Sequence, residues 1–229
     1  MRYIILIIFS VCFMSNVQAQ IYEVGFFLGT SNFIGDVGST KYIAPTKPAG
    51  GLLLKWNRSP RHSFRASILF TELEGNDAYS DDPRRVARNY AFKNSILELS
   101  AGMEFTFLDF DLHSLDPQMT PYLYTGISTA KHKNYFFDTN GVQTYENTQS
   151  WAYGIPMVLG FKATAFDGLI LGAEIGVRYT FSDEIDGSVP DTPSRKPLSF
   201  GNLNSNDWYV FSGITVTYTF GEKPCYCDY

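Results

Sequence analysis

Hydrophobic and polar residues alternate along most of this chain, which is the period of a β-strand with one apolar face. The clearest segment is 169–182, where seven apolar residues occupy the odd positions from Leu169 to Phe181 and Gly, Glu, Arg, Thr and Ser occupy the even ones, with Ile170 as the exception. Residues 97–107 and 208–220 repeat the pattern. Alternation is less regular in five further segments, 21–29, 50–57, 63–71, 121–130 and 154–163. The pattern therefore predicts eight strands.

The predicted connections alternate between long and short. Four are long (35–49, 72–91, 131–150 and 183–207), two are short (58–62 and 165–168), and 108–120 is intermediate. Outer-membrane barrels place short turns on the periplasmic side and long loops outside. The segments also have about the length of a tilted membrane-crossing strand, which takes about 9–11 residues. We therefore predict an all-β fold, a single eight-stranded antiparallel up-and-down transmembrane β-barrel of the outer membrane, with periplasmic termini.

A secreted two-sheet sandwich is the alternative, because its strands would alternate as well. The polar face of a sandwich meets solvent and is usually rich in Lys and Glu. Here that face consists mainly of Gly, Ser and Thr with isolated charges, which suits the narrow interior of a small barrel. In the segment 121–130 the alternation does not decide which face is apolar, because Tyr122 and Tyr124 compete with Leu123 and Ile127 for that side.

The same parity predicts which charged residues point into the barrel. They are Glu23, Lys55, Arg65, Glu98, Glu104, Lys162, Glu174 and Arg178. Four acids and four bases give the balance expected where charges leave bulk water and must pair. Glu174 and Arg178 are about 13 Å apart on one strand, so we expect their partners on neighbouring strands. Since side chains just fill an eight-stranded interior, we expect no porin-like channel.

The N-terminus predicts export. A short positive end, Met1-Arg2, precedes a nearly apolar stretch from Ile4 to Phe13, and Val17-Gln18-Ala19 fits the small-residue cleavage pattern of a signal peptide. We therefore divide the chain into a signal peptide (1–19), a barrel (20–221) and a periplasmic C-terminal tail (222–229). No run of 18 apolar residues occurs, which argues against a membrane-spanning helix.

Composition and motifs narrow the function further. With 45% hydrophobic and 16% aromatic residues the chain can bury enough surface to fold, and a net charge of −5 argues against nucleic acid as a partner. Three histidines without zinc-ligand spacing predict no metal, cofactor or small-molecule substrate. A lipid hydrolase would have to use Ser128 and His132, and we expect no enzyme. The cluster Asp183-Glu184-Ile185-Asp186 lacks the dense oxygen spacing of a calcium loop.

The tail contains Cys225 and Cys227, separated by one residue. A disulfide between them would close a small, strained ring. In an oxidising periplasm, leftover cysteines suggest pairing with another chain. A tail with a strained disulfide or free thiols of no functional importance is the alternative.

Three blocks of sequence resemble the PorG family of Bacteroidetes outer-membrane barrels. They are Ser31–Asp36, Arg178–Asp186 and Asn206–Gly221, the last followed by Cys225-Tyr226-Cys227. The resemblance implies a non-catalytic component of the type IX protein secretion system that anchors or bridges a periplasmic ring, built from a lipoprotein and its partner, to the outer membrane. Its partners would be outer-membrane lipids and the ring subunits, which the tail would dock or disulfide-link. The alternative is a free-standing OmpA-like barrel or adhesin that binds an extracellular ligand through its long loops.

Overall fold

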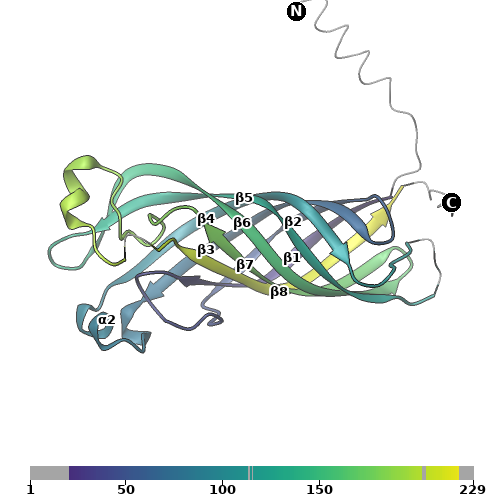
Figure 1. Ribbon diagram of the computed structural model, residues 1–229, viewed down its shortest axis with the longest axis horizontal. Coiled ribbons are helices and arrows are strands. Elements are labelled where there is room, and N and C mark those ends of the chain that lie inside the picture. The colour runs from purple at the N-terminus through teal and green to yellow at the C-terminus, as the bar shows by residue number, and fades with distance from the viewer. Residues whose placement is uncertain (1–20, 113, 115, 203–204, 222–229) are drawn as a thin grey trace, which may run out of the picture.

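The computed structural model describes residues 21–221 except 113, 115, 203 and 204. These residues form one closed barrel in which each strand pairs antiparallel with its neighbour in sequence and β8 pairs back to β1 (Figure 1). The strands are β1 (Ile21–Ile34), β2 (Lys47–Asn57), β3 (His62–Asn76), β4 (Ala91–Thr106), β5 (Met119–Phe137), β6 (Gln143–Phe166), β7 (Leu169–Thr180) and β8 (Trp208–Phe220). The predicted eight-stranded up-and-down barrel is confirmed.

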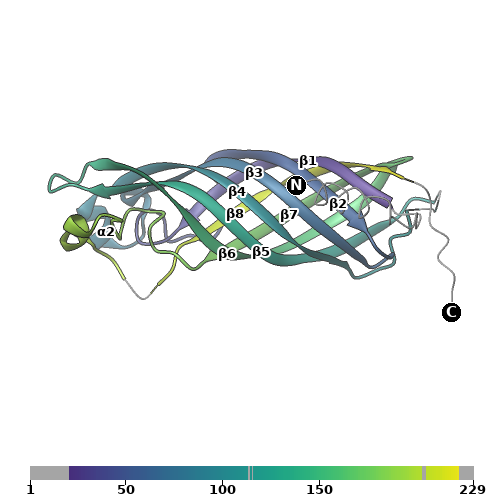
Figure 2. The same ribbon diagram turned by 90° about the horizontal axis from the view of Figure 1, so that it is seen from above.

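The two ends of the barrel differ. Figures 1 and 2 show the long connections at one end, the long-loop end, and the start of β1 with the end of β8 at the other, the turn end. Among the described residues, three short helices lie in the long connections: η1 (Asp77–Tyr79), α2 (Pro83–Arg88) and η2 (Pro193–Leu198). No helix in the described part of the chain is long and apolar enough to cross a membrane.

The faces of the strands follow the predicted parity. Outward side chains such as Phe26 and Leu159 are more than half exposed, at 58% and 55%. In β5, where the sequence left the faces open, Tyr122 and Tyr124 point inward and are each 1% exposed, while Ile127 points outward and is 73% exposed.

The predicted loop 131–150 is wrong, because β5 and β6 continue through most of it. The two strands remain paired from Phe137 opposite Gln143 onward, and only residues 138–142 connect them. Alternation fails there because Tyr135, Phe136 and Phe137 are all buried. Phe137 packs against Phe200 of the long connection before β8, with ring centroids 5.6 Å apart. The segment therefore forms a hairpin extension that carries part of the core at the long-loop end.

The interior has two zones, whereas the sequence predicted only small polar residues and charges. Toward the long-loop end it is an apolar core of large side chains, among them Phe27, Leu53, Leu69, Phe92 and Phe211. Apart from Phe92, which lies between Ala91 and Lys93, these residues occupy inward positions within segments whose outward positions are also apolar, so alternation does not reveal them. Ile185, from the connection after β7, is fully buried in this core. Polar and charged side chains fill the zone nearer the turn end.

Candidate functional site

A network of ion pairs occupies the interior nearer the turn end. The eight charged residues that parity placed inside come from six strands, and each is at most 6% exposed. We call Glu23, Lys55, Arg65, Glu98, Glu104, Lys162, Glu174 and Arg178 the interior charge network.

Arg65 and Glu174 form its best-aligned pair. Two guanidinium nitrogens of Arg65 donate to the two carboxylate oxygens of Glu174 at 2.7 and 2.8 Å. The Tyr122 hydroxyl donates to the same carboxylate at 2.6 Å. A bidentate arginine–carboxylate pair is strong and fixes both side chains in orientation. This contact also explains why Tyr122 points inward rather than toward the apolar exterior.

Glu104 links two lysines from opposite sides of the barrel. Its carboxylate oxygens lie 2.8 Å from the Lys55 ammonium and 2.8 Å from the Lys162 ammonium. Lys55 lies directly opposite Arg65 across the β2–β3 ladder, so two cations are neighbours there. Glu104 on one side and Glu174 on the other compensate this repulsion. Glu23 adds a weaker contact, 3.8 Å from Lys55.

Glu98 and Arg178 form the boundary with the apolar core. Arg178 Nε donates to Glu98 at 3.2 Å, and the Tyr209 hydroxyl donates to the other carboxylate oxygen at 2.6 Å. The guanidinium of Arg178 also lies over the Phe211 ring, 4.6 Å from its centroid. Polar and apolar zones therefore meet at this pair.

The partners of Glu174 and Arg178 do not lie on neighbouring strands, contrary to the sequence prediction. Glu174 of β7 pairs with Arg65 of β3, and Arg178 of β7 pairs with Glu98 of β4. An eight-stranded interior is narrow enough for long side chains to meet across it. The pairs therefore bridge the lumen and close it, which leaves the network suited to a structural role.

Ser128 and His132 do not form a catalytic pair. Both belong to β5 and lie four residues apart, about 13 Å along the strand, beyond hydrogen-bond reach. Both are also buried. The predicted signal peptide, the tail and the candidate partner-binding residues Cys225 and Cys227 lie outside the described residues.

The outer wall carries aromatic residues at both ends of an apolar belt. At the turn end, Tyr22 stacks on Phe220 and Trp56 packs on Phe64. At the long-loop end, Trp208 packs against Tyr179, with ring centroids 4.8 Å apart. Trp208 and Phe220 are twelve residues apart on β8, which corresponds to about 40 Å along the strand and about 30 Å of height at a tilt of about 40°.

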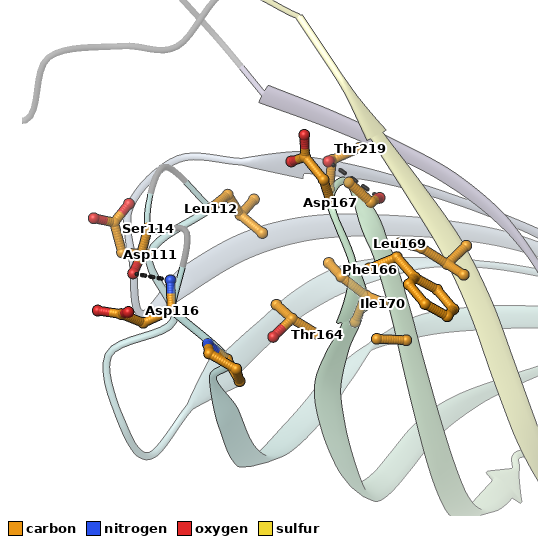
Figure 3. Close-up of a pocket in the computed structure, with 13 residues that line it drawn as sticks. Asp111, Leu112, Ser114, Asp116, Thr164, Phe166, Asp167, Leu169, Ile170 and Thr219 are labelled. Atoms are coloured by element: carbon orange, nitrogen blue, oxygen red, sulfur yellow. Dashed lines mark hydrogen bonds between the residues drawn. The ribbon is translucent and has the colours of Figure 1, made fainter.

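A small hollow lies at the turn end, between residues 107–118 and the β6–β7 turn. Its volume is about 160 Å³. Figure 3 shows Ser114 and Asp116 on one side, with Asp167 and Thr219 on the other. Drug-sized ligands occupy pockets of about 300–1,000 Å³, so the hollow is smaller than a typical small-molecule site.

The three sequence blocks that resemble PorG meet at the long-loop end. Phe33 and Ile34 of the first block pair with Tyr209 and Trp208 of the third. In the second block, Arg178 pairs with Tyr209 across the β7–β8 ladder. The first block, the second block and the start of the third are therefore neighbours at the long-loop end, while the rest of the third follows β8 to the turn end.

Comparisons with known proteins identify one matching family and several similar folds. The family model described as Domain of unknown function (DUF6089) matches residues 2–229. No match was found among curated proteins. Neisserial surface protein A (NspA) is similar in structure, with a TM-score of 0.46 and 10% identity over 88% of this chain and 97% of that one. For a major outer membrane protein from Thermus thermophilus the TM-score is 0.45, with 12% identity over 88% of this chain and 100% of that one. For Ail of Yersinia pestis it is 0.43, with 9% identity over 89% and 100%.

Proposed function

The chain belongs to the DUF6089 family of domains, and we propose that it is an outer-membrane barrel that anchors or bridges a periplasmic ring of the type IX secretion system. The closed interior supports an anchoring or bridging role rather than transport through the barrel. A barrel whose lumen is filled by ion pairs and an apolar core can hold partners in place but offers no path for a folded cargo protein.

The outer wall supports residence in a membrane. Its outward side chains, such as Phe26, Leu159 and Ile214, are apolar and more than half exposed, at 58%, 55% and 54%. In water such a surface would cost about 25 cal/mol for each Å² of apolar area left exposed. The aromatic residues at both ends of the belt match the girdles that flank the lipid-facing band of outer-membrane barrels.

The unequal ends give the barrel an orientation. Short turns face the periplasm in barrels of this class, so the turn end faces the periplasm and the long-loop end faces outward. β1 begins and β8 ends at the periplasmic side in this orientation (Figure 1). The hollow beside Asp116 and Asp167 then faces the periplasmic ring subunits.

The secretion role rests on the resemblance of the three sequence blocks to the PorG family. It predicts that the tagged chain, extracted from envelopes with detergent under non-reducing conditions, co-purifies with a lipoprotein and its ring partner. Deleting the chain should abolish secretion of type IX cargo. Recovery of the chain from the soluble periplasm would overturn the membrane assignment, and normal cargo secretion in the deletion strain would overturn the secretion role.

A charge-reversal pair tests which end binds the ring. Asp116→Lys with Asp167→Lys changes two exposed acids at the turn end and should reduce recovery of the ring subunits. Asp81→Lys with Asp191→Lys makes the same change in charge at the long-loop end and is the matched control. Equal recovery from both variants would argue against docking at the turn end. Loss of surface binding alone in the control would favour the free-standing barrel or adhesin.

A further inference from the structure

Three aspartates from two separate segments meet at the long-loop end of the barrel. Asp183 and Asp186 lie in the connection after β7, and Asp207 immediately precedes β8. One carboxylate oxygen from each residue lies within 4.8 Å of the others. Asp186 and Asp207 are fully buried, and Asp183 is partly buried. We call these three residues the mouth aspartates.

The mouth aspartates differ from the acids of the interior charge network and from Asp77, which are paired with cations. Glu98 has Arg178, Glu104 has Lys55 and Lys162, Glu174 has Arg65, and Asp77 has Arg88, all at 3.2 Å or less. Among the described residues, no lysine or arginine makes a salt bridge to a mouth aspartate. Uncompensated buried charge is costly, so such a group is expected either to neutralise or to bind a cation.

Two oxygen atoms in the cluster have no hydrogen-bond partner within the described part of the chain. They are Oδ1 of Asp207 and Oδ2 of Asp183. The other oxygen of Asp207 accepts from the Ile185 amide at 2.9 Å, so the side chain is held in one orientation with its free oxygen still buried. A Cβ at Gly35 would lie 2.5 Å from Asp207 Oδ1, so glycine at this position leaves room for the Asp207 carboxylate. An orphaned oxygen on a fully buried carboxylate is the feature that a bound cation would complete.

Backbone amides orient the third carboxylate of the cluster, that of Asp186. Asp186 Oδ2 accepts from the amides of Asp36 and Val37 at 2.8 and 3.2 Å, and its Oδ1 accepts from the Ser188 amide at 3.0 Å. The site therefore joins the end of β1, the connection after β7 and the start of β8.

The electrostatics agree with this geometry. Burial, reinforced by Asp186 and Asp36, raises the pKa of Asp183 to about 7. Burial together with Asp186 and Asp183 raises the pKa of Asp207 well above its usual range. Mutual repulsion of this kind disappears when a cation lies between the carboxylates.

We propose that Asp183, Asp186 and Asp207 bind one Ca²⁺ ion in the mouth of the barrel. All three ligands are oxygens, which select hard cations over zinc or copper. Mg²⁺ usually keeps several of its waters and uses only one or two carboxylates, whereas Ca²⁺ accepts a cage of protein oxygens at about 2.3–2.6 Å. Three carboxylate oxygens within 4.8 Å of one another, two of them on fully buried residues, therefore favour Ca²⁺ over Mg²⁺. The inference is independent of the proposed secretion partner.

The ion would hold Ile185 in the apolar core. Ile185 lies between Asp183 and Asp186, and its amide donates to Asp207. Its carbonyl accepts hydrogen bonds from Asn94 and from the Tyr135 hydroxyl at 3.1 and 3.0 Å. Calcium would therefore stabilise contacts that the connection after β7 already makes with the barrel, rather than create new ones.

Calorimetric titration of the full chain in detergent with CaCl₂ tests the site. The wild-type chain should bind one ion. Asp207→Asn keeps the shape of the side chain but removes its charge, and should weaken binding at least tenfold. Asp81→Asn, an exposed acid at the same end, is the matched control and should bind as the wild type does. Equal binding by the wild type and Asp207→Asn would overturn the proposal, and equal affinity for MgCl₂ would overturn the assignment to calcium.

Hydrogen exchange gives a second readout that does not depend on Asp207→Asn folding. In the wild-type chain, Ca²⁺ should slow exchange of the amides of Asp36, Val37, Ile185 and Ser188, which donate to the site, relative to EDTA. Asp183→Asn, whose side chain is only partly buried, should lose this protection while keeping heat-modifiable migration on gels. Unchanged exchange in the wild type with and without Ca²⁺ would also overturn the proposal.

Discussion

Arg65 of β3 and Glu174 of β7 lie on opposite walls of the barrel and meet in its interior through two hydrogen bonds of 2.7 and 2.8 Å. The Tyr122 hydroxyl completes the arrangement from a third wall at 2.6 Å. The contact joins parts of the wall that share no backbone hydrogen bonds. Its energetic role can therefore be separated from that of the strand ladders.

Replacing one partner of this pair should be costly. Glu174→Gln leaves the Arg65 guanidinium buried without its counter-charge and should lower the free energy of unfolding by about 3–5 kcal/mol. Arg65→Met combined with Glu174→Gln removes both charges and should cost less than Glu174→Gln alone. Urea unfolding of the refolded barrel in lipid vesicles measures both. A double variant less stable than Glu174→Gln would show that the pair does more than compensate charge.

Substitutions on β8 can test which part of the outer wall lies at the centre of the membrane. Ile214 lies midway between the aromatic residues Trp208 and Phe220, and Ile214→Arg should cost about 2–4 kcal/mol of unfolding free energy. Tyr218→Arg lies near one edge of the belt and should cost only about 0–1 kcal/mol. Unfolding in vesicles gives the comparison. Since both side chains are about equally exposed, at 54% and 55%, equal costs would contradict the membrane assignment.

Loosening the apolar core should not open a pore. Ile185→Ala deletes a fully buried side chain and should cost about 2–5 kcal/mol, with faster hydrogen exchange in residues 181–188. Because the interior charge network lies nearer the turn end and stays intact, conductance in planar bilayers should remain at the baseline of the wild-type chain. A porin-like current from either protein would refute the closed lumen.

The tail cysteines can be tested directly in cells. If they link the barrel to a ring subunit, Cys225→Ser with Cys227→Ser should remove a high-molecular-weight band on non-reducing gels and reduce cargo secretion. Reduction of the wild-type sample should remove the same band. An unchanged band pattern together with unchanged secretion would exclude a covalent link.

Much of the fold could be predicted because each strand carries its orientation in its own sequence. The odd positions of 169–181 are apolar and meet the exterior, which parity alone indicates. In β5 parity was ambiguous, since tyrosine suits either face. Tyr122 points inward because its hydroxyl reaches Glu174, and Tyr124 does so because its hydroxyl donates to Ser100 at 3.0 Å. Such long-range hydrogen bonds leave no local signal.

Less of the candidate functional site than of the fold could be predicted from the sequence. Parity indicated which charged residues face inward, but their partners depend on which walls approach one another across the lumen. The mouth aspartates show the same limit, because Asp186 and Asp207 are separated by a long connection whose path no spacing rule describes. Considered by itself, the sequence Asp183-Glu184-Ile185-Asp186 has too few oxygen ligands for a calcium site. The fold supplies the missing carboxylate from the start of β8.

The lumen-crossing pairs divide the barrel into two complementary halves. Strands β1–β4 contribute three interior acids and two bases of the network, while β5–β8 contribute two bases and one acid. One half therefore has an interior charge of −1 and the other +1, and neutrality is reached only when the two close on each other. A chimaera that takes β5–β8 from an unrelated barrel would inherit a mismatched interior. A substitution that changes the network charge of one half therefore needs a compensating change in the other half to keep the network neutral.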